Sequence, residues 1–161
     1  VTIFEKSSQV GGVWVYEPEV DDDITGVDPT STVHSSLYDS LRTNLPRDLM
    51  AFSDYYFDST GGGEDTWPRY PHHSKVLEYL ERFAVDHDLT KTMRLGTTVT
   101  RLKPSLEERG DDANRRPKWL VESDDAEGNF SREAFDAVAV CNGHDSNPRV
   151  PIRPGLKPFP G

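Results

Sequence analysis

The pattern of hydrophobic and polar positions predicts one long helix in the middle of the chain. Apolar residues recur there with helical spacing: Val76, Leu77, Leu80, Phe83 and Ala84. Pro71 stands at the predicted start of this helix, and His72 and His73 follow it. Pro46 is expected to open a second, short helical turn that runs through Met50. The centre of the chain is therefore expected to be helical.

Short stretches of β-type residues lie on both sides of this helix. Residues 1–4 are expected to form a buried strand. Four further stretches follow the helix, at 92–95, 97–102, 119–122 and 130–132, and the last three predict a small antiparallel meander. FDAVAVC at 135–141 is a near-continuous apolar run, which predicts a parallel strand covered on both faces. This order of elements indicates an α/β fold.

Composition narrows the class of protein. At 161 residues the chain suits one domain with a hydrophobic core. Its 18 basic and 28 acidic residues give a net charge of −10, which argues against a surface for nucleic acid or for an anionic membrane. No apolar stretch approaches the roughly 18 residues that a membrane span needs, and no signal peptide is expected. The single cysteine excludes an internal disulfide and favours a reducing, cytoplasmic setting.

Two groups near the N-terminus are candidates for contact with a nucleotide. Glu5 stands at the expected end of the first strand, where a carboxylate can accept hydrogen bonds from ribose hydroxyls. On position alone, an ordinary surface glutamate fits equally well. Gly11 and Gly12 allow close backbone approach or positive φ, and Trp14 offers a flat face and one donor. A plain turn with a core tryptophan would give the same pattern.

Two further candidates follow later elements. Asn44 lies in an apolar neighbourhood and has both donors and an acceptor, which suits a polar atom of a cofactor. Spacing alone favours a simpler role as a turn cap before Pro46. Gly143 follows the apolar run at 135–141, and ligands of open α/β sheets gather at the carboxyl ends of strands. A simple turn there is equally compatible with the sequence.

The sequence gives little support to metal, thiol or hydrolase chemistry. The five histidines contain no pair at a recognised zinc spacing, so no metal site is predicted. Cys141 follows an apolar run and is expected to be an inert core residue. No G-x-S-x-G stretch indicates a hydrolase, and no C-x-x-C pair indicates a flavin disulfide reductase.

Six stretches make the sequence similar to the flavin-containing monooxygenase family, in particular to its plant S-oxygenating, glucosinolate-oxidase-like branch. They are FEK at 4–6, GGVWVY at 11–16, HSSLYDSLRTNLPRDLM at 34–50, RYPHHSKVLEYLERFA at 69–84, FDAVAVCNGH at 135–144 and FPG at 159–161. The resemblance implies a partial Rossmann-like FAD-binding domain over residues 1–147, without the first strand and the GxGxxG turn. It also implies that the Pro-rich residues 148–161 cross over toward an NADPH-binding domain. An internal fragment is therefore expected.

The resemblance also implies roles for particular residues. Glu5 matches the family's acid on the FAD ribose, and Val13 and Trp14 match positions that contact FAD. Asn44 matches the asparagine beside the flavin and is the implied catalytic residue. Thr43 and Asn44 also lie where NADP contacts the first domain. The remaining implied FAD neighbours are Leu45, Val99 and Gly143.

The activity that the resemblance implies is monooxygenation. In the family, NADPH reduces FAD, and O₂ then forms a C4a-hydroperoxyflavin whose distal oxygen passes to the thioether sulfur or amine nitrogen of a small molecule. A Baeyer–Villiger monooxygenase and a catalytically inactive truncated module are the alternatives. Without the glycine-rich turn, the isolated chain is expected to bind FAD poorly and to be inactive.

Overall fold

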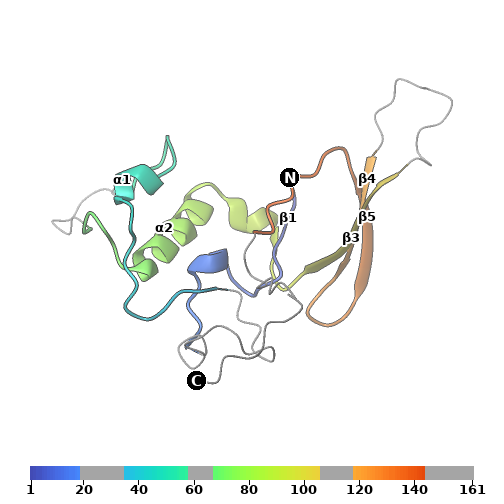
Figure 1. Cartoon of the computed structure of the whole chain (residues 1–161). Coiled ribbons are helices and arrows are strands. Elements are labelled where there is room, and N and C mark those ends of the chain that lie inside the picture. Colours follow the sequence, from blue (N-terminus) through green and yellow to red (C-terminus); the bar gives the residue numbers. More distant parts are fainter. Residues whose placement is uncertain (19–34, 58–66, 106–117, 144–161) are drawn as a thin grey trace, which may run out of the picture.

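The computed structural model describes residues 1–18, 35–57, 67–105 and 118–143 (Figure 1). The predictions for the Pro-rich segment 148–161 lie outside these residues. The same holds for the matches at His34, His144 and FPG 159–161. These predictions are not tested by the fold.

The described part of the chain combines helices with two small sheets. In chain order the elements are β1 (Ile3–Phe4), a 3₁₀ turn (Gly12–Trp14), α1 (Arg47–Met50), α2 (His73–Asp86), a second 3₁₀ turn (Leu89–Thr92), β2 (Met93–Arg94), β3 (Thr98–Ser105), β4 (Lys118–Asp124) and β5 (Phe130–Phe135). Figure 1 shows α1 and α2 on one side of β1 and the strands β3, β4 and β5 on the other. No described helix is long and apolar enough to cross a membrane.

The strands form a parallel pair and an antiparallel meander. β1 runs parallel to β2, with Ile3 opposite Met93. β3, β4 and β5 follow one another in antiparallel order, and the register of β3 against β4 shifts between Val99 and Arg101. Both the meander and the α/β class were predicted and are confirmed. The meander strands are longer than the β-type stretches of the sequence because pairing satisfies the backbone of their less apolar ends as well.

Helix α2 begins and is buried as its sequence pattern predicts. The Nδ1 atom of His72 accepts a hydrogen bond from the backbone N–H of Ser74 at 3.3 Å, which satisfies one of the free donors at the helix start. Along the buried face, Val76 is 3% and Tyr79 is 3% exposed. The predicted start and apolar face of α2 are therefore confirmed, as is the short helix α1 after Pro46.

The core lies between α2 and the segment that follows α1. Its buried members are Tyr55, Phe57, Val76 and Tyr79. The rings of Phe57 and Tyr79 stack with centroids 4.0 Å apart. The Tyr79 hydroxyl donates to the carbonyl of Tyr55 at 2.7 Å and accepts from the N–H of Phe52 at 2.8 Å. The side chain of Tyr79 thereby fixes the backbone of the segment packed against the helix.

The predicted parallel strand at 135–141 is wrong. β5 ends at Phe135, and residues 136–143 form no strand and are exposed, with Val140 67% accessible. Cys141 is exposed as well, so its assignment to the core is also wrong. An apolar run becomes a strand only where a neighbouring strand pairs with its N–H and C=O groups. Within the described residues no strand is hydrogen-bonded to this segment.

Candidate functional site

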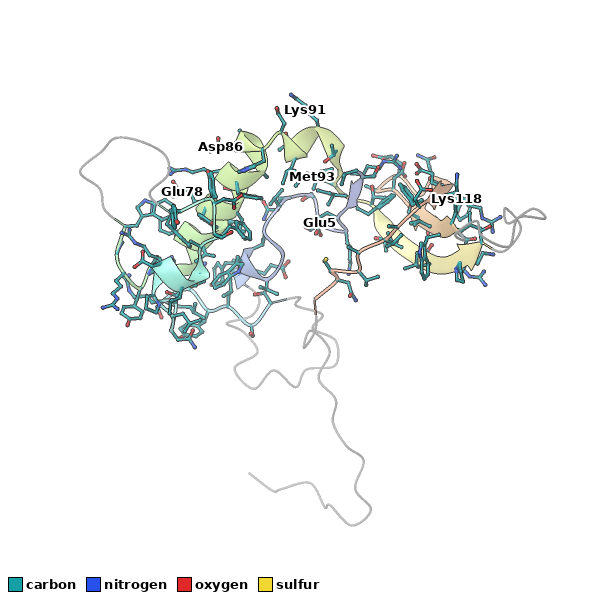
Figure 2. The ribbon with its side chains drawn as sticks, turned by 90° about the horizontal axis from the view of Figure 1, so that it is seen from above. Glu5, Glu78, Asp86, Lys91, Met93 and Lys118 are labelled. Atoms are coloured by element: carbon teal, nitrogen blue, oxygen red, sulfur yellow. The ribbon has the colours of Figure 1, made fainter. Side chains whose placement is uncertain are left out.

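Glu5 is held at the carboxyl end of β1 by backbone and side-chain hydrogen bonds. Its N–H donates to the carbonyl of Arg94 at 3.1 Å, and its carbonyl accepts from the N–H of Thr97 at 2.9 Å. Its Oε1 accepts from both the N–H and the hydroxyl of Ser7, at 2.8 and 2.9 Å. Figure 2 shows Glu5 near Met93, the first residue of β2. Within the described residues the second oxygen, Oε2, has no partner, so it can accept hydrogen bonds from a ligand.

The turn after β1 has a backbone that only glycine adopts readily. Gly11 has φ +131° and Gly12 has φ +52°. The N–H of Trp14 donates to the carbonyl of Gly11 at 3.0 Å, which closes the 3₁₀ turn. Trp14 packs against the core cluster, whereas Val13 is 51% exposed. Of the two predicted FAD contacts in this turn, Val13 is the more accessible and Trp14 mainly supports the core.

The segment that carries Asn44 is attached to the start of α2. The N–H of Thr43 donates to the carbonyl of Pro71 at 3.0 Å, and the N–H of His73 donates to the carbonyl of Leu41 at 3.1 Å. Asn44 itself is exposed, and its side chain has no hydrogen-bond partner among the described residues. A rigid backbone with a free amide at its tip can hold a polar ligand atom without first breaking an internal bond.

Thr43 and Leu45 differ in how accessible they are. The side chain of Thr43 is buried, and its hydroxyl donates to the carbonyl of Leu45 at 2.8 Å. This bond uses the only hydroxyl proton, so Thr43 mainly fixes the turn around Asn44. Leu45 is exposed and offers an apolar contact.

The predicted site residues are attached to different parts of the fold. Trp14 and the segment 43–45 are both attached to α2. Trp14 packs on the core cluster, which contains residues of α2, and residues 41–43 form hydrogen bonds to the start of the helix. Glu5 instead rests on residues 94–97. Val99 lies in β3 at the register shift, and Gly143 is exposed at the end of the described residues. Among the described residues, no hydrogen bond or ring contact joins Val99 or Gly143 to the other site residues.

Sequence reasoning missed residues that hold the predicted site in place. Ser7 binds the carboxylate of Glu5, and the hydroxyl of Ser35 donates to the carbonyl of Val13 at 2.6 Å. A serine two residues after an acid is a recognisable local turn pattern, so Ser7 could have been found from the sequence. Ser35 is 22 residues from Val13, and no spacing rule predicts such a contact.

A cluster of Asp39, His72 and His73 was also missed. Their potential ligand atoms lie within 4.8 Å of one another. The Nε2 atoms of His72 and His73 lie 2.6 and 3.2 Å from the backbone carbonyl of Asp39, which accounts for both atoms as hydrogen-bond donors. The Nδ1 atom of His73 is buried without a partner. The cluster is explained as an anchor for the segment before Asn44, and the absence of a metal site stays a prediction.

Shifted pKa values accompany the packing contacts. Burial, together with a 2.6 Å hydrogen bond to Asp86, raises the pKa of Tyr55 to about 12. The hydrogen bond from Arg132 lowers the pKa of the Glu122 carboxyl in the meander. Tyr55 and Glu122 both lie outside the predicted set of cofactor contacts.

Comparison with known proteins gives matches along the whole chain. The family model described as "Flavin-binding monooxygenase-like" matches residues 1–161. The chain is 42% identical over 163 residues to the flavin-containing monooxygenase FMO GS-OX-like 6 of Arabidopsis thaliana, covering all of this chain and 33% of the relative. It thus spans about a third of the length of the curated relatives it matches.

Two solved structures have a fold similar to that of this chain. The S-allyl-L-cysteine S-oxygenase from Allium sativum is 41% identical, with a TM-score of 0.75 over 96% of this chain and 33% of that one. A cyclohexanone monooxygenase is 23% identical, with a TM-score of 0.52 over 81% of this chain and 20% of that one, and shows the fold alone. The resemblance inferred from the sequence motifs is confirmed. The chain belongs to the flavin-binding monooxygenase-like family.

Proposed function

We propose that this chain forms part of the FAD-binding region of an NADPH-dependent monooxygenase that transfers oxygen from O₂ to a soft nucleophile. The observation that carries the proposal is the 41% identity to an S-oxygenase over nearly the whole chain. Because that protein is named for S-allyl-L-cysteine, the thioether sulfur of a small molecule is the favoured acceptor, and an amine nitrogen is the second choice.

Residues of the chain fit FAD at two places. The free Oε2 of Glu5 suits ribose hydroxyls, since a carboxylate accepts but does not donate. The Gly11–Gly12 turn brings backbone and the exposed Val13 close to an incoming ligand. When bound, FAD supplies the redox and oxygen chemistry, while these residues bind and orient it. Val99 and Gly143 are proposed as further backbone contacts.

Asn44 is the proposed catalytic residue. Its amide offers two donors and one acceptor, and the bonds of Thr43 and Leu41 to the start of α2 keep its backbone in place. We infer that this amide binds the flavin and NADP together and so keeps the oxygen-transferring site closed to water. Thr43 fixes the turn, and Leu45 provides an apolar contact beside it.

Coupling between NADPH use and product formation tests this assignment. In the full-length protein that contains these residues, Asn44→Ala is expected to divert NADPH oxidation to hydrogen peroxide and to lower the yield of sulfoxide per NADPH. Ser40→Ala is the matched control, because Ser40 is exposed in the same segment and lies outside the proposed site. Unchanged coupling in Asn44→Ala would remove Asn44 from the mechanism.

The substrate alternatives can be separated in the same assay. A Baeyer–Villiger monooxygenase would oxidise a cyclic ketone, whereas the favoured reading predicts turnover of a thioether. The Baeyer–Villiger alternative is supported only by a likeness of fold to cyclohexanone monooxygenase, at 23% identity. If the protein binds no FAD and does not oxidise NADPH with either substrate, the inactive module is favoured. The division into residues 1–147 and a crossover at 148–161 remains part of the proposal.

The chemical setting follows from composition. A net charge of −10 disfavours nucleic-acid partners, and a single cysteine suits a reducing compartment such as the cytoplasm. The family match, rather than composition, is the basis for proposing a small-molecule substrate and O₂ as partners.

A further inference from the structure

The carboxylate of Glu5 has one occupied oxygen and one free oxygen. Oε1 accepts from the N–H of Ser7 at 2.8 Å and lies 2.9 Å from its hydroxyl, whereas Oε2 has no partner in the described part of the chain. We propose that Ser7 is a positioning residue, which binds Oε1 and so presents Oε2 of Glu5 to a ribose hydroxyl of the cofactor. This inference rests on the proposed function, because it assumes that FAD is the ligand.

The backbone around Glu5 is already fixed without Ser7's side chain. The N–H and carbonyl of Glu5 bond to residues 94 and 97, and the carbonyl of Ser7 accepts from the N–H of Gly96 at 2.8 Å. Only the side-chain torsions of Glu5 therefore remain free. A long, flexible carboxylate loses conformational entropy when it binds a ligand, and a residue that orders it beforehand removes that cost from binding.

Ser7 is suited to this task because both of its donors point to one oxygen. Hydrogen bonds to a charged acceptor are stronger than those between neutral groups, so the two bonds from Ser7 fix the position of the Glu5 side chain. The hydroxyl of Ser7 also lies 2.8 Å from the carbonyl of Gln9. Since a hydroxyl has a single proton, it shares that proton between the carboxylate and the chain that leads to Gly11. Ser7 thereby links the ribose-binding acid to the glycine turn.

The arrangement also specifies which oxygen the ligand meets. A carboxylate can accept about four hydrogen bonds, two on each oxygen. Two donors of Ser7 already face Oε1 of Glu5, so the ribose hydroxyls are directed to Oε2. The contribution of Ser7 must therefore depend on the hydroxyls of the adenosine ribose. A serine that only stabilised the fold would show no such dependence.

The test measures FAD affinity of the full-length protein after removal of its flavin, by quenching of flavin fluorescence. Ser7→Ala is expected to raise the Kd for FAD on the order of five- to tenfold, because one hydrogen bond to a charged group is lost and the N–H bond remains. Ser7→Thr keeps the hydroxyl and should stay close to wild type. Ser8→Ala is the matched control, since Ser8 is the exposed neighbour.

Two further measurements separate positioning from a merely structural role. In a Glu5→Ala background, Ser7→Ala should change the Kd less than twofold, because no carboxylate is left to orient. An FAD analogue whose adenosine ribose lacks both hydroxyls should bind wild type and Ser7→Ala equally. The proposal would be overturned if Ser7→Ala raised the Kd by the same factor in the Glu5→Ala background, or for the analogue, as it does for FAD and wild-type Glu5. An unchanged Kd for FAD in Ser7→Ala would also overturn it. Wild-type protein that binds no FAD would instead refute the proposed function itself.

Discussion

Replacing Gly11 with alanine tests how the glycine turn is packed against α2. Gly11 has φ +131°, and a Cβ placed there would lie 2.3 Å from Cδ1 of Leu77 and 3.0 Å from Cγ2 of Val15. Gly12 is the matched control, because it also has positive φ, +52°, but a Cβ there meets no atom within 4 Å. Gly11→Ala should therefore combine strain and steric overlap, whereas Gly12→Ala should show strain alone.

The expected magnitudes follow from these distances. The backbone of Gly11 would cost alanine about 1–3 kcal/mol. Displacing the flexible end of Leu77 from its rotamer adds about 0.5–1.5 kcal/mol. Alanine also has less conformational entropy than glycine in the unfolded chain, which stabilises the folded state by about 0.4–1 kcal/mol and offsets part of this cost. At the centre of these ranges, Gly11→Ala should lower the free energy of unfolding by about 2 kcal/mol. Gly12→Ala, in the milder left-handed region, should lower it by about 0.5–1 kcal/mol.

Urea unfolding followed by tryptophan fluorescence provides the assay, since Trp14 lies in the turn itself. The comparison should be repeated in a Leu77→Ala background, where the overlap with Leu77 disappears, while the close contact with Val15 and the backbone strain remain. Two results would refute the reasoning. The first is equal destabilisation by Gly11→Ala and Gly12→Ala. The second is a Gly11→Ala cost that does not fall when Leu77 is truncated.

Three other substitutions test the core and the meander. Tyr55→Phe removes the bond to Asp86 and should lower the urea-unfolding free energy by about 1–2 kcal/mol. Because the folded pKa of Tyr55 is raised from 10.0 to about 12, this stabilisation is complete below pH 10.0 and lost toward pH 12, and the variant should lack that alkaline slope. Tyr79→Phe leaves two backbone groups unpaired and should cost about 2–4 kcal/mol in the same assay. Arg132 lowers the folded pKa of Glu122, so the wild-type protein should lose stability as pH falls below 4.5. Glu122→Gln should lose less over the same range, measured as the urea midpoint at each pH.

Local patterns predicted the elements whose stability depends on their own residues. The start of α2 at His72 and His73 could be predicted, because Pro71 and the spacing of the apolar residues are both visible in the sequence. The meander was predicted from separate β-type stretches. Its exact strand ends were not, because they depend on which residues of the neighbouring strand are available for pairing.

Features that depend on distant partners were missed. The run 135–141 has the composition of a buried strand, yet the described residues offer it no pairing partner and it stays exposed. The contact of Asp39 with His72 and His73 joins residues more than 30 positions apart. For the candidate site, the sequence identified Glu5 and Asn44 but gave no information on which of their polar atoms are already bonded.

The two polar groups proposed to meet the cofactor share one design. Glu5 and Asn44 each lie on a backbone held by hydrogen bonds to a separate element, the 94–97 segment in the first case and the start of α2 in the second. Each keeps a polar side-chain atom without a partner among the described residues. An unpaired polar atom costs little while water can reach it, and it becomes valuable when a ligand with the matching group displaces that water. FAD is long enough to need contacts at both its adenosine and its flavin end, so separate rigid supports with free polar tips are the arrangement expected to bind it. Substitutions in the aromatic core beneath α2 should accordingly weaken the Asn44 contact while leaving the hydrogen bonds of Glu5 intact.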